Sequence, residues 1–155
     1  MALVIGLFAL AACDDDPGPD PRAFVEIGTG DDYLVWEPLT PGQQVDLHAG
    51  TQGGYHVWGG FKGDYFEPEG IEYDFVLWDG ATRVGGVDYV LDRAIRGRSG
   101  SYELGGVPVF IQEDLDVASL DGKRLRMTLE LRSEDGAVLT DEVMVVARCC
   151  VELPE

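Results

Sequence analysis

Apolar and polar side chains alternate along most of the chain, and helical periodicity is scarce. The clearest alternation covers residues 124–131, where three leucines and a methionine at odd positions are separated by charged or hydroxyl side chains. A period of two is typical of a strand with one buried face. A turn rich in acidic residues and glycine follows at 133–136, so we predict that residues 138–148 form the second strand of a hairpin.

Shorter runs of the same kind predict the other strands. They cover residues 23–27, 33–36, 44–49, 55–61, 71–78, 83–90 and 107–111. The arginine- and glycine-containing stretch 91–106 is predicted to be a long loop. Seven to nine short strands at a spacing of about 8–12 residues indicate an all-β fold, most simply an antiparallel β-sandwich. An up-and-down barrel is the alternative.

Two features resemble bacterial immunoglobulin-like domains. Residues 121–147 contain a turn, a strand, a tight hairpin and a second strand, like the last two strands of those domains, and Trp58 stands in the third or fourth predicted strand. The resemblance implies an immunoglobulin-like sandwich over residues 23–155. The family's inter-sheet disulfide is missing, because no two cysteines are spaced to join two sheets.

The N-terminal segment has a different pattern. Residues 1–12 contain no charged or polar side chain, but the run is shorter than the ~20 apolar residues that a membrane-spanning helix needs. An apolar run that ends in small residues is typical of a secretory signal. Leu10-Ala11-Ala12-Cys13 resembles the lipobox of bacterial lipoproteins, which implies cleavage before Cys13 and a covalent lipid on that cysteine. The alternative is an ordinary cleaved signal with an incidental cysteine.

The segment after the lipobox is predicted to be a solvated tether. Residues 13–22 contain four aspartates and three prolines, which cannot build a core and which extend the chain. The whole sequence has a formal net charge of −18. So acidic a surface repels nucleic acid, which excludes it as a partner. The charge serves solubility in one interpretation and attracts cations or basic partners in the other.

Cys149 and Cys150 are adjacent, so they cannot staple distant parts of the fold. Neighbouring strand residues point to opposite faces, which makes a bond between them geometrically awkward. Three interpretations stay open: ordinary thiols, a vicinal or intermolecular disulfide, and metal or redox chemistry.

The only two histidines, His48 and His56, flank the glycine-rich connection 50–54. They are equidistant from Gln52, so a hairpin would place them opposite each other and offer two imidazoles to zinc or copper. In the alternative interpretation His56, which shares a strand face with Trp58, is a core-edge histidine that is hydrogen-bonded to backbone.

Catalytic signatures are missing from the sequence. No GxSxG elbow occurs, and neither histidine stands in a recognisable triad motif. Exposed aromatic side chains offer a binding route instead, with candidates at Tyr33, Trp36, Tyr55, Trp58, Tyr65, Phe66 and Trp78. Tyr65 and Phe66 are predicted to be the exposed pair, because Gly63 and Pro68 bracket them as a loop.

The sequence therefore predicts a lipoprotein of the bacterial cell envelope, held on the extracytoplasmic side of the outer or inner membrane. Residues 50–58 also resemble a stretch found in uncharacterised predicted lipoproteins of soil bacteria. We expect a binding or scaffolding domain with a protein or glycan partner, no catalytic activity, and no cofactor besides the lipid on Cys13. The alternative function is binding of zinc or copper by His48 and His56.

Overall fold

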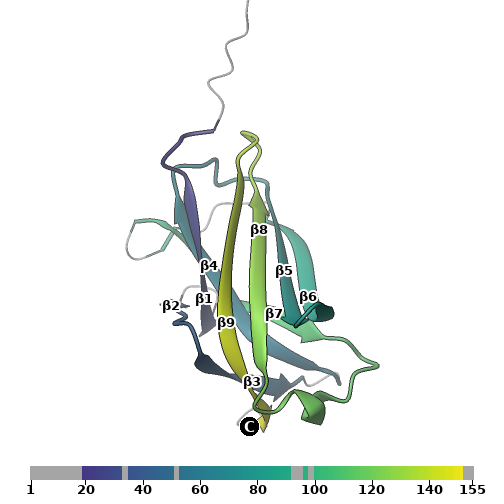
Figure 1. Ribbon diagram of the computed structural model, residues 1–155. Helices are drawn as coiled ribbons and strands as arrows, with labels where there is room; N and C mark the ends of the chain where they lie inside the picture. The colour runs from purple at the N-terminus through teal and green to yellow at the C-terminus, as the bar shows by residue number, and fades with distance from the viewer. Residues whose placement is uncertain (1–18, 33–34, 51–52, 92–95, 98–99, 152–155) are drawn as a thin grey trace, which may run out of the picture.

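The computed structural model describes residues 19–32, 35–50, 53–91, 96–97 and 100–151 (Figure 1). Within them lie nine strands and one short 3₁₀ helix, η1. Their bounds are β1 Phe24–Asp32, β2 Val35–Pro38, β3 Gln43–Ala49, β4 Tyr55–Asp64, β5 Ile71–Asp79, β6 Thr82–Leu91, β7 Tyr102–Ile111, η1 Val117–Leu120, β8 Arg124–Arg132 and β9 Val138–Val151. The predicted hairpin of β8 and β9 is confirmed, with a continuous register from Arg124 to Arg132.

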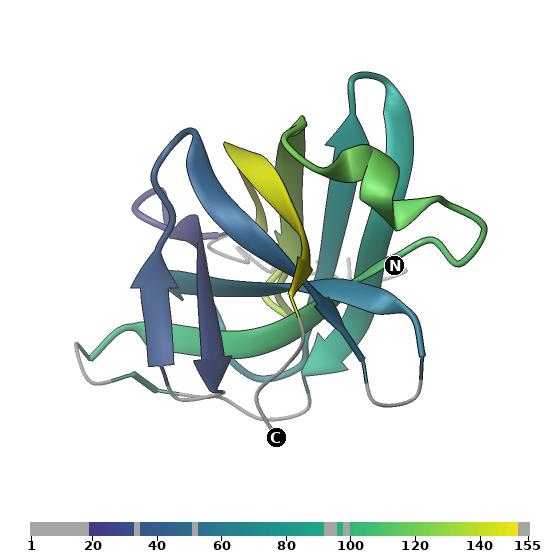
Figure 2. The same cartoon turned by 90° about the horizontal axis from the view of Figure 1, so that it is seen from below.

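The strands form one sheet that closes on itself. Hydrogen-bonded neighbours follow the order β4-β3-β9-β8-β5-β6-β7, and β7 pairs with β4 to complete a seven-stranded barrel. Two additional strands continue from β4, since β1 pairs with β4 and β2 pairs with β1. Figure 2 shows these two strands side by side at one flank of the molecule.

The all-β prediction is confirmed, but the immunoglobulin-like β-sandwich is wrong. A sandwich needs two separate sheets, whereas β4 joins both ends of this sheet. The start of β4 pairs with β3, its later residues pair with β1 on the same edge, and its other edge pairs with β7. A simple up-and-down barrel is not formed either, because β3 and β9 run parallel.

The predicted loop over 91–106 is too long, because β7 already begins at Tyr102. Glycines in this part of the chain serve close strand packing. A Cβ placed on Gly60 would lie 2.6 Å from the Leu104 carbonyl oxygen and 3.2 Å from the Gly105 Cα atom. The β4–β7 register shifts between Gly59 and Phe61, which is how an irregularity bends a strand around a barrel.

Inward-facing side chains from all sides fill the barrel. Alternate residues of β5 and β8, among them Phe75 and Leu129, are almost fully buried. Phe75 reaches the opposite wall, since a Cβ on Gly59 of β4 would lie 3.6 Å from its ring. The outward positions of the same strands are left for polar side chains, and these build the sites described below.

A side chain closes the seam between β1 and β9, the line along which these two strands meet. β3 covers the second half of β9, and β1 lies against β9 near Asp141. No backbone ladder joins β1 to β9 in the described ranges; instead the Ile27 N–H donates to Asp141 Oδ2 at 2.7 Å. Ile27 is 2% exposed, so this carboxylate satisfies a buried donor that water cannot reach.

Residues 1–18 lie outside the described residues, together with the predicted signal and Cys13. The tether prediction is therefore described only from residue 19 onward, where Asp20 pairs with Arg22 at 2.7 Å. None of the helices in the described part of the chain has the length and apolarity to span a membrane.

Candidate functional site

The outer face of β5, β6 and β8 carries a row of carboxylates. Asp74 of β5 stands directly opposite Asp88 of β6 on one side and Glu130 of β8 on the other, and Thr140 of β9 follows Glu130. Like charges directly opposite each other destabilise a sheet. This row of carboxylates therefore does not stabilise the sheet, and it concentrates negative charge on the outer face of the barrel.

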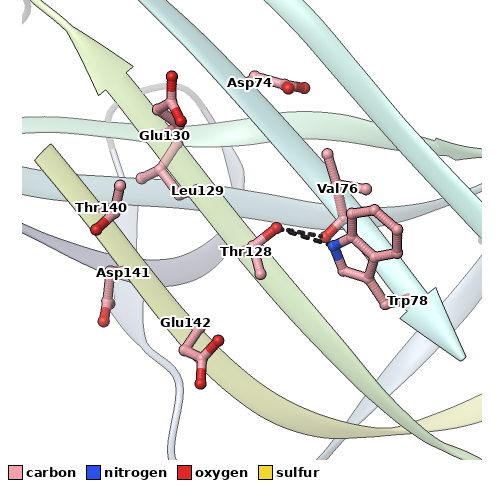
Figure 3. A pocket seen from close by; sticks show the side chains of 9 residues that line it. All are labelled: Asp74, Val76, Trp78, Thr128, Leu129, Glu130, Thr140, Asp141 and Glu142. Carbon is pink, nitrogen blue, oxygen red and sulfur yellow. Dashed lines mark hydrogen bonds between the residues drawn. The ribbon is translucent and has the colours of Figure 1, made fainter. Parts of the chain in front are cut away.

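A hollow of about 540 Å³ lies beside this row on the face formed by β5, β8 and β9. We name it the acidic hollow; its outward-facing lining is Asp74, Val76, Trp78, Thr128, Glu130, Thr140 and Glu142 (Figure 3). Trp78 Nε1 donates to Thr128 Oγ1 at 3.1 Å, which fixes the indole beside the short side chains of Val76 and Thr128. The hollow thus has an apolar part next to carboxylates.

The basic residues of this face neutralise only some of the acids. Arg126 lies 3.4 Å from Glu142, and Arg132 forms an ion pair with Glu130. Among the described residues, no cation forms an ion pair with Asp74. Because Asp74 is exposed, its charge is available to a ligand. A second hollow of about 690 Å³ continues from it and shares Asp74 and Glu130.

The structure brings the two histidines together. His48 of β3 and His56 of β4 are register partners, and their ring centroids are 5.8 Å apart. Trp58 packs edge-on against His56 with 4.4 Å between centroids. The hairpin on which the two-histidine hypothesis depended is thus present. In the described ranges no third His, Cys, Asp or Glu joins them in a group that could hold a metal.

The backbone hydrogen bond expected for a core-edge His56 is not made by its Nε2 atom, which is buried without a partner. Burial, followed by the nearby charge of His48, lowers the pKa of His56 below its ordinary value. Next to this pair, Arg148 binds Asp46 in a bidentate ion pair with distances of 2.6 and 2.7 Å, which lowers the pKa of the Asp46 carboxyl.

The predicted exposed pair Tyr65 and Phe66 is half correct. Tyr65 is 46% exposed, with the Arg22 guanidinium 4.4 Å from its ring centre. Phe66 is 6% exposed and its ring lies over Gly63, where a Cβ would come within 2.6 Å of it. The positive φ of Tyr65, 62°, turns the chain so that the second aromatic residue enters the core.

The other candidate residues are placed as follows. Cys149 and Cys150 are joined in a disulfide at the end of β9, which corresponds to the vicinal interpretation. Cys149 packs partly against the core. Of the other aromatic candidates, Trp36, Tyr55, Trp58 and Trp78 are half-buried, and Tyr33 lies outside the described residues.

The acidic hollow could not be predicted from the sequence. Asp79 and Thr82 close a hairpin around Gly80 and Ala81, and counting back along both strands from this turn would place Val87 opposite Asp74. A register shift between Leu77 and Trp78 brings Asp88 to that position instead. Glu130 comes from β8, which does not follow β5 directly in the chain.

Comparison with models of known protein families gives no match, and comparison with curated proteins gives no significant match either. The functional assignment therefore depends on the side chains alone.

Proposed function

We propose that this protein is a lipid-anchored binding or scaffolding protein of the bacterial cell envelope, not an enzyme, and that the acidic hollow receives a cationic side chain of a protein partner. The observation that carries the second part is the exposed Asp74 beside Trp78 and Val76, which forms no ion pair with any residue that the structure describes. The lipid anchor is supported by the lipobox-like sequence that ends at Cys13.

A lysine or arginine of the partner matches the chemistry of the acidic hollow. Such side chains bury an apolar stem while the charged end stays near carboxylates or water. The stem would lie on Val76 and Thr128, and the charge would lie between Asp74 and Glu130. The Arg126 guanidinium already lies 5.6 Å from the centre of the Trp78 ring, within the range of a cation–π contact, so the indole offers the partner only the apolar surface beside Val76. The net charge of −18 draws basic partners in at long range.

The cation-binding part is tested with a hexalysine peptide titrated against the purified full chain. We expect the double variant Asp74→Asn, Glu130→Gln to bind the peptide about tenfold more weakly, which corresponds to about 1.4 kcal/mol. Binding by the native protein should weaken as salt is added, because exposed charges are screened. Isothermal calorimetry at two salt concentrations measures both effects.

A matched control separates the site from the net charge. The variant Asp31→Asn, Glu37→Gln removes the same two charges from exposed positions on β1 and β2, far from the acidic hollow in the strand order. It should bind the peptide nearly as well as the native protein. Equal weakening in both double variants would show that only the total charge matters, and the acidic hollow would be rejected.

The anchor is tested by replacing Cys13. We expect Cys13→Ala to move the protein from the membrane fraction to the soluble fraction of expressing cells. Two or more acyl chains attach a protein stably to a membrane, and this variant has no lipobox cysteine to carry them. Immunoblotting of fractionated cells measures the distribution. The control Cys150→Ser leaves the lipobox intact and should stay with the membranes. Continued pelleting of the Cys13 variant would reject the lipid anchor.

A further inference from the structure

The barrel carries a second group of side chains that the proposed function does not use. His48 and His56 stand opposite each other on the outer face of β3 and β4. Trp58 lies at 4.4 Å and Phe110 at 6.2 Å from His56, measured between ring centroids. Two imidazoles therefore lie side by side, with aromatic rings next to His56.

Each imidazole has a nitrogen without a partner. His48 Nδ1 and His56 Nε2 are both buried and make no hydrogen bond, and His56 as a whole is only 6% exposed. Buried polar atoms in proteins nearly always have a partner, and an exception calls for an explanation such as a bound water or ion. The two unpartnered nitrogens belong to rings that face each other in register, which favours one ligand shared between them.

The spacing of the rings fits one bridging ion. A metal about 2.0–2.1 Å from one nitrogen of each ring would leave the ring centroids roughly 5.2 to 6.4 Å apart, from a tetrahedral to a linear arrangement. The observed separation of 5.8 Å lies in this interval.

The number of ligands selects the metal. In the described part of the chain no further His, Cys, Asp or Glu completes a group of three around these imidazoles. Zinc in proteins is almost always four-coordinate, and copper(II) prefers a tetragonal set of nitrogen and oxygen ligands. Copper(I) accepts two nitrogen ligands in a bent or linear arrangement, so these two imidazoles are sufficient for it.

We propose that His48 and His56 bind a single copper(I) ion, with Nδ1 of His48 and Nε2 of His56 as its ligands. The site lies apart from the acidic hollow, which is on β5, β8 and β9. It gives the protein a metal-binding activity that does not depend on the cationic partner.

The test is anaerobic titration of the full chain with copper(I) in competition with a colorimetric copper(I) chelator. Because thiolates also bind copper(I), every protein carries Cys13→Ser, Cys149→Ser and Cys150→Ser. We expect one equivalent to bind, and we expect His48→Phe and His56→Phe each to weaken binding more than about 100-fold, since even the loss of an outer-shell partner costs 10–100-fold. Phenylalanine keeps the ring packing and removes the nitrogens.

Two further measurements keep the result unambiguous. Gln44→Ala, on the same outward face of β3, should bind copper(I) like the parent protein, and thermal unfolding should show that each variant is folded. Quenching of Trp58 fluorescence on binding, absent in Trp58→Phe, would place the ion at this site. The proposal would be overturned if the cysteine-free parent protein did not bind copper(I), if binding were unchanged in both histidine variants, or if zinc bound more tightly than copper(I).

Discussion

Replacing Phe75 with alanine is expected to lower the free energy of unfolding by about 3–5 kcal/mol, the usual cost of deleting a fully buried aromatic side chain. Phe75 is 0% exposed. Its ring spans the barrel from β5 to the backbone at Gly59, so neither wall can collapse into the space without bending strands that are paired on both edges. The cavity would persist, and its cost adds to the lost transfer free energy.

Urea unfolding followed by circular dichroism measures this loss. Because a domain of this size is typically stable by only about 5–15 kcal/mol, the variant should unfold at a much lower urea concentration. Phe24→Ala is the control, since Phe24 is 39% exposed on β1 and its truncation should cost much less. A loss below about 1 kcal/mol for Phe75→Ala would contradict a filled barrel interior.

The strands could be predicted because the alternation of apolar and polar residues within each strand indicates which of its side chains are buried. Residues 124–131 alternate without a break, and the structure has β8 over Arg124–Arg132 with the odd positions inside. β7 was predicted too short for the opposite reason. Gly105 and Gly106 have no side chain to alternate, and Gly105 lies close to β4 at Gly60.

Closure of the barrel could not be predicted from these local patterns. A sandwich and a barrel both require one apolar face per strand, so the same alternation serves either fold. The difference is made by which strands pair, and the decisive pairs, β4 with β7 and β3 with β9, join segments far apart in the chain. Only the short connection at 50–54 allowed the pairing of His48 with His56 to be anticipated.

The same limit explains the site predictions. Phe66 lies in a stretch that looks like a surface loop, but a single residue with positive φ directs it into the core. The carboxylates of the acidic hollow come from separate strands, and their proximity depends on registers that no local pattern encodes. Residue types can thus be read from the sequence, whereas their grouping requires the fold.

Replacing Asp141 with leucine is expected to cost about 1–3 kcal/mol of unfolding free energy, because it leaves a buried N–H without an acceptor. The carboxylate of Asp141 accepts the Ile27 N–H at 2.7 Å, at the seam where β1 and β9 share no backbone ladder. Water cannot replace it, since Ile27 is 2% exposed. Leucine is similar in size, so the lost acceptor dominates the effect.

Two comparisons assign the loss to this hydrogen bond. Asp141→Asn keeps an acceptor oxygen and should recover most of the stability, whereas Glu142→Leu, one residue along β9, removes only an exposed ion pair worth about 0–1 kcal/mol. Hydrogen exchange gives a local readout: the Ile27 amide should exchange faster in Asp141→Leu than in either comparison variant. Unchanged protection of that amide would mean that β1 is held by packing alone, and that the carboxylate does not close the seam.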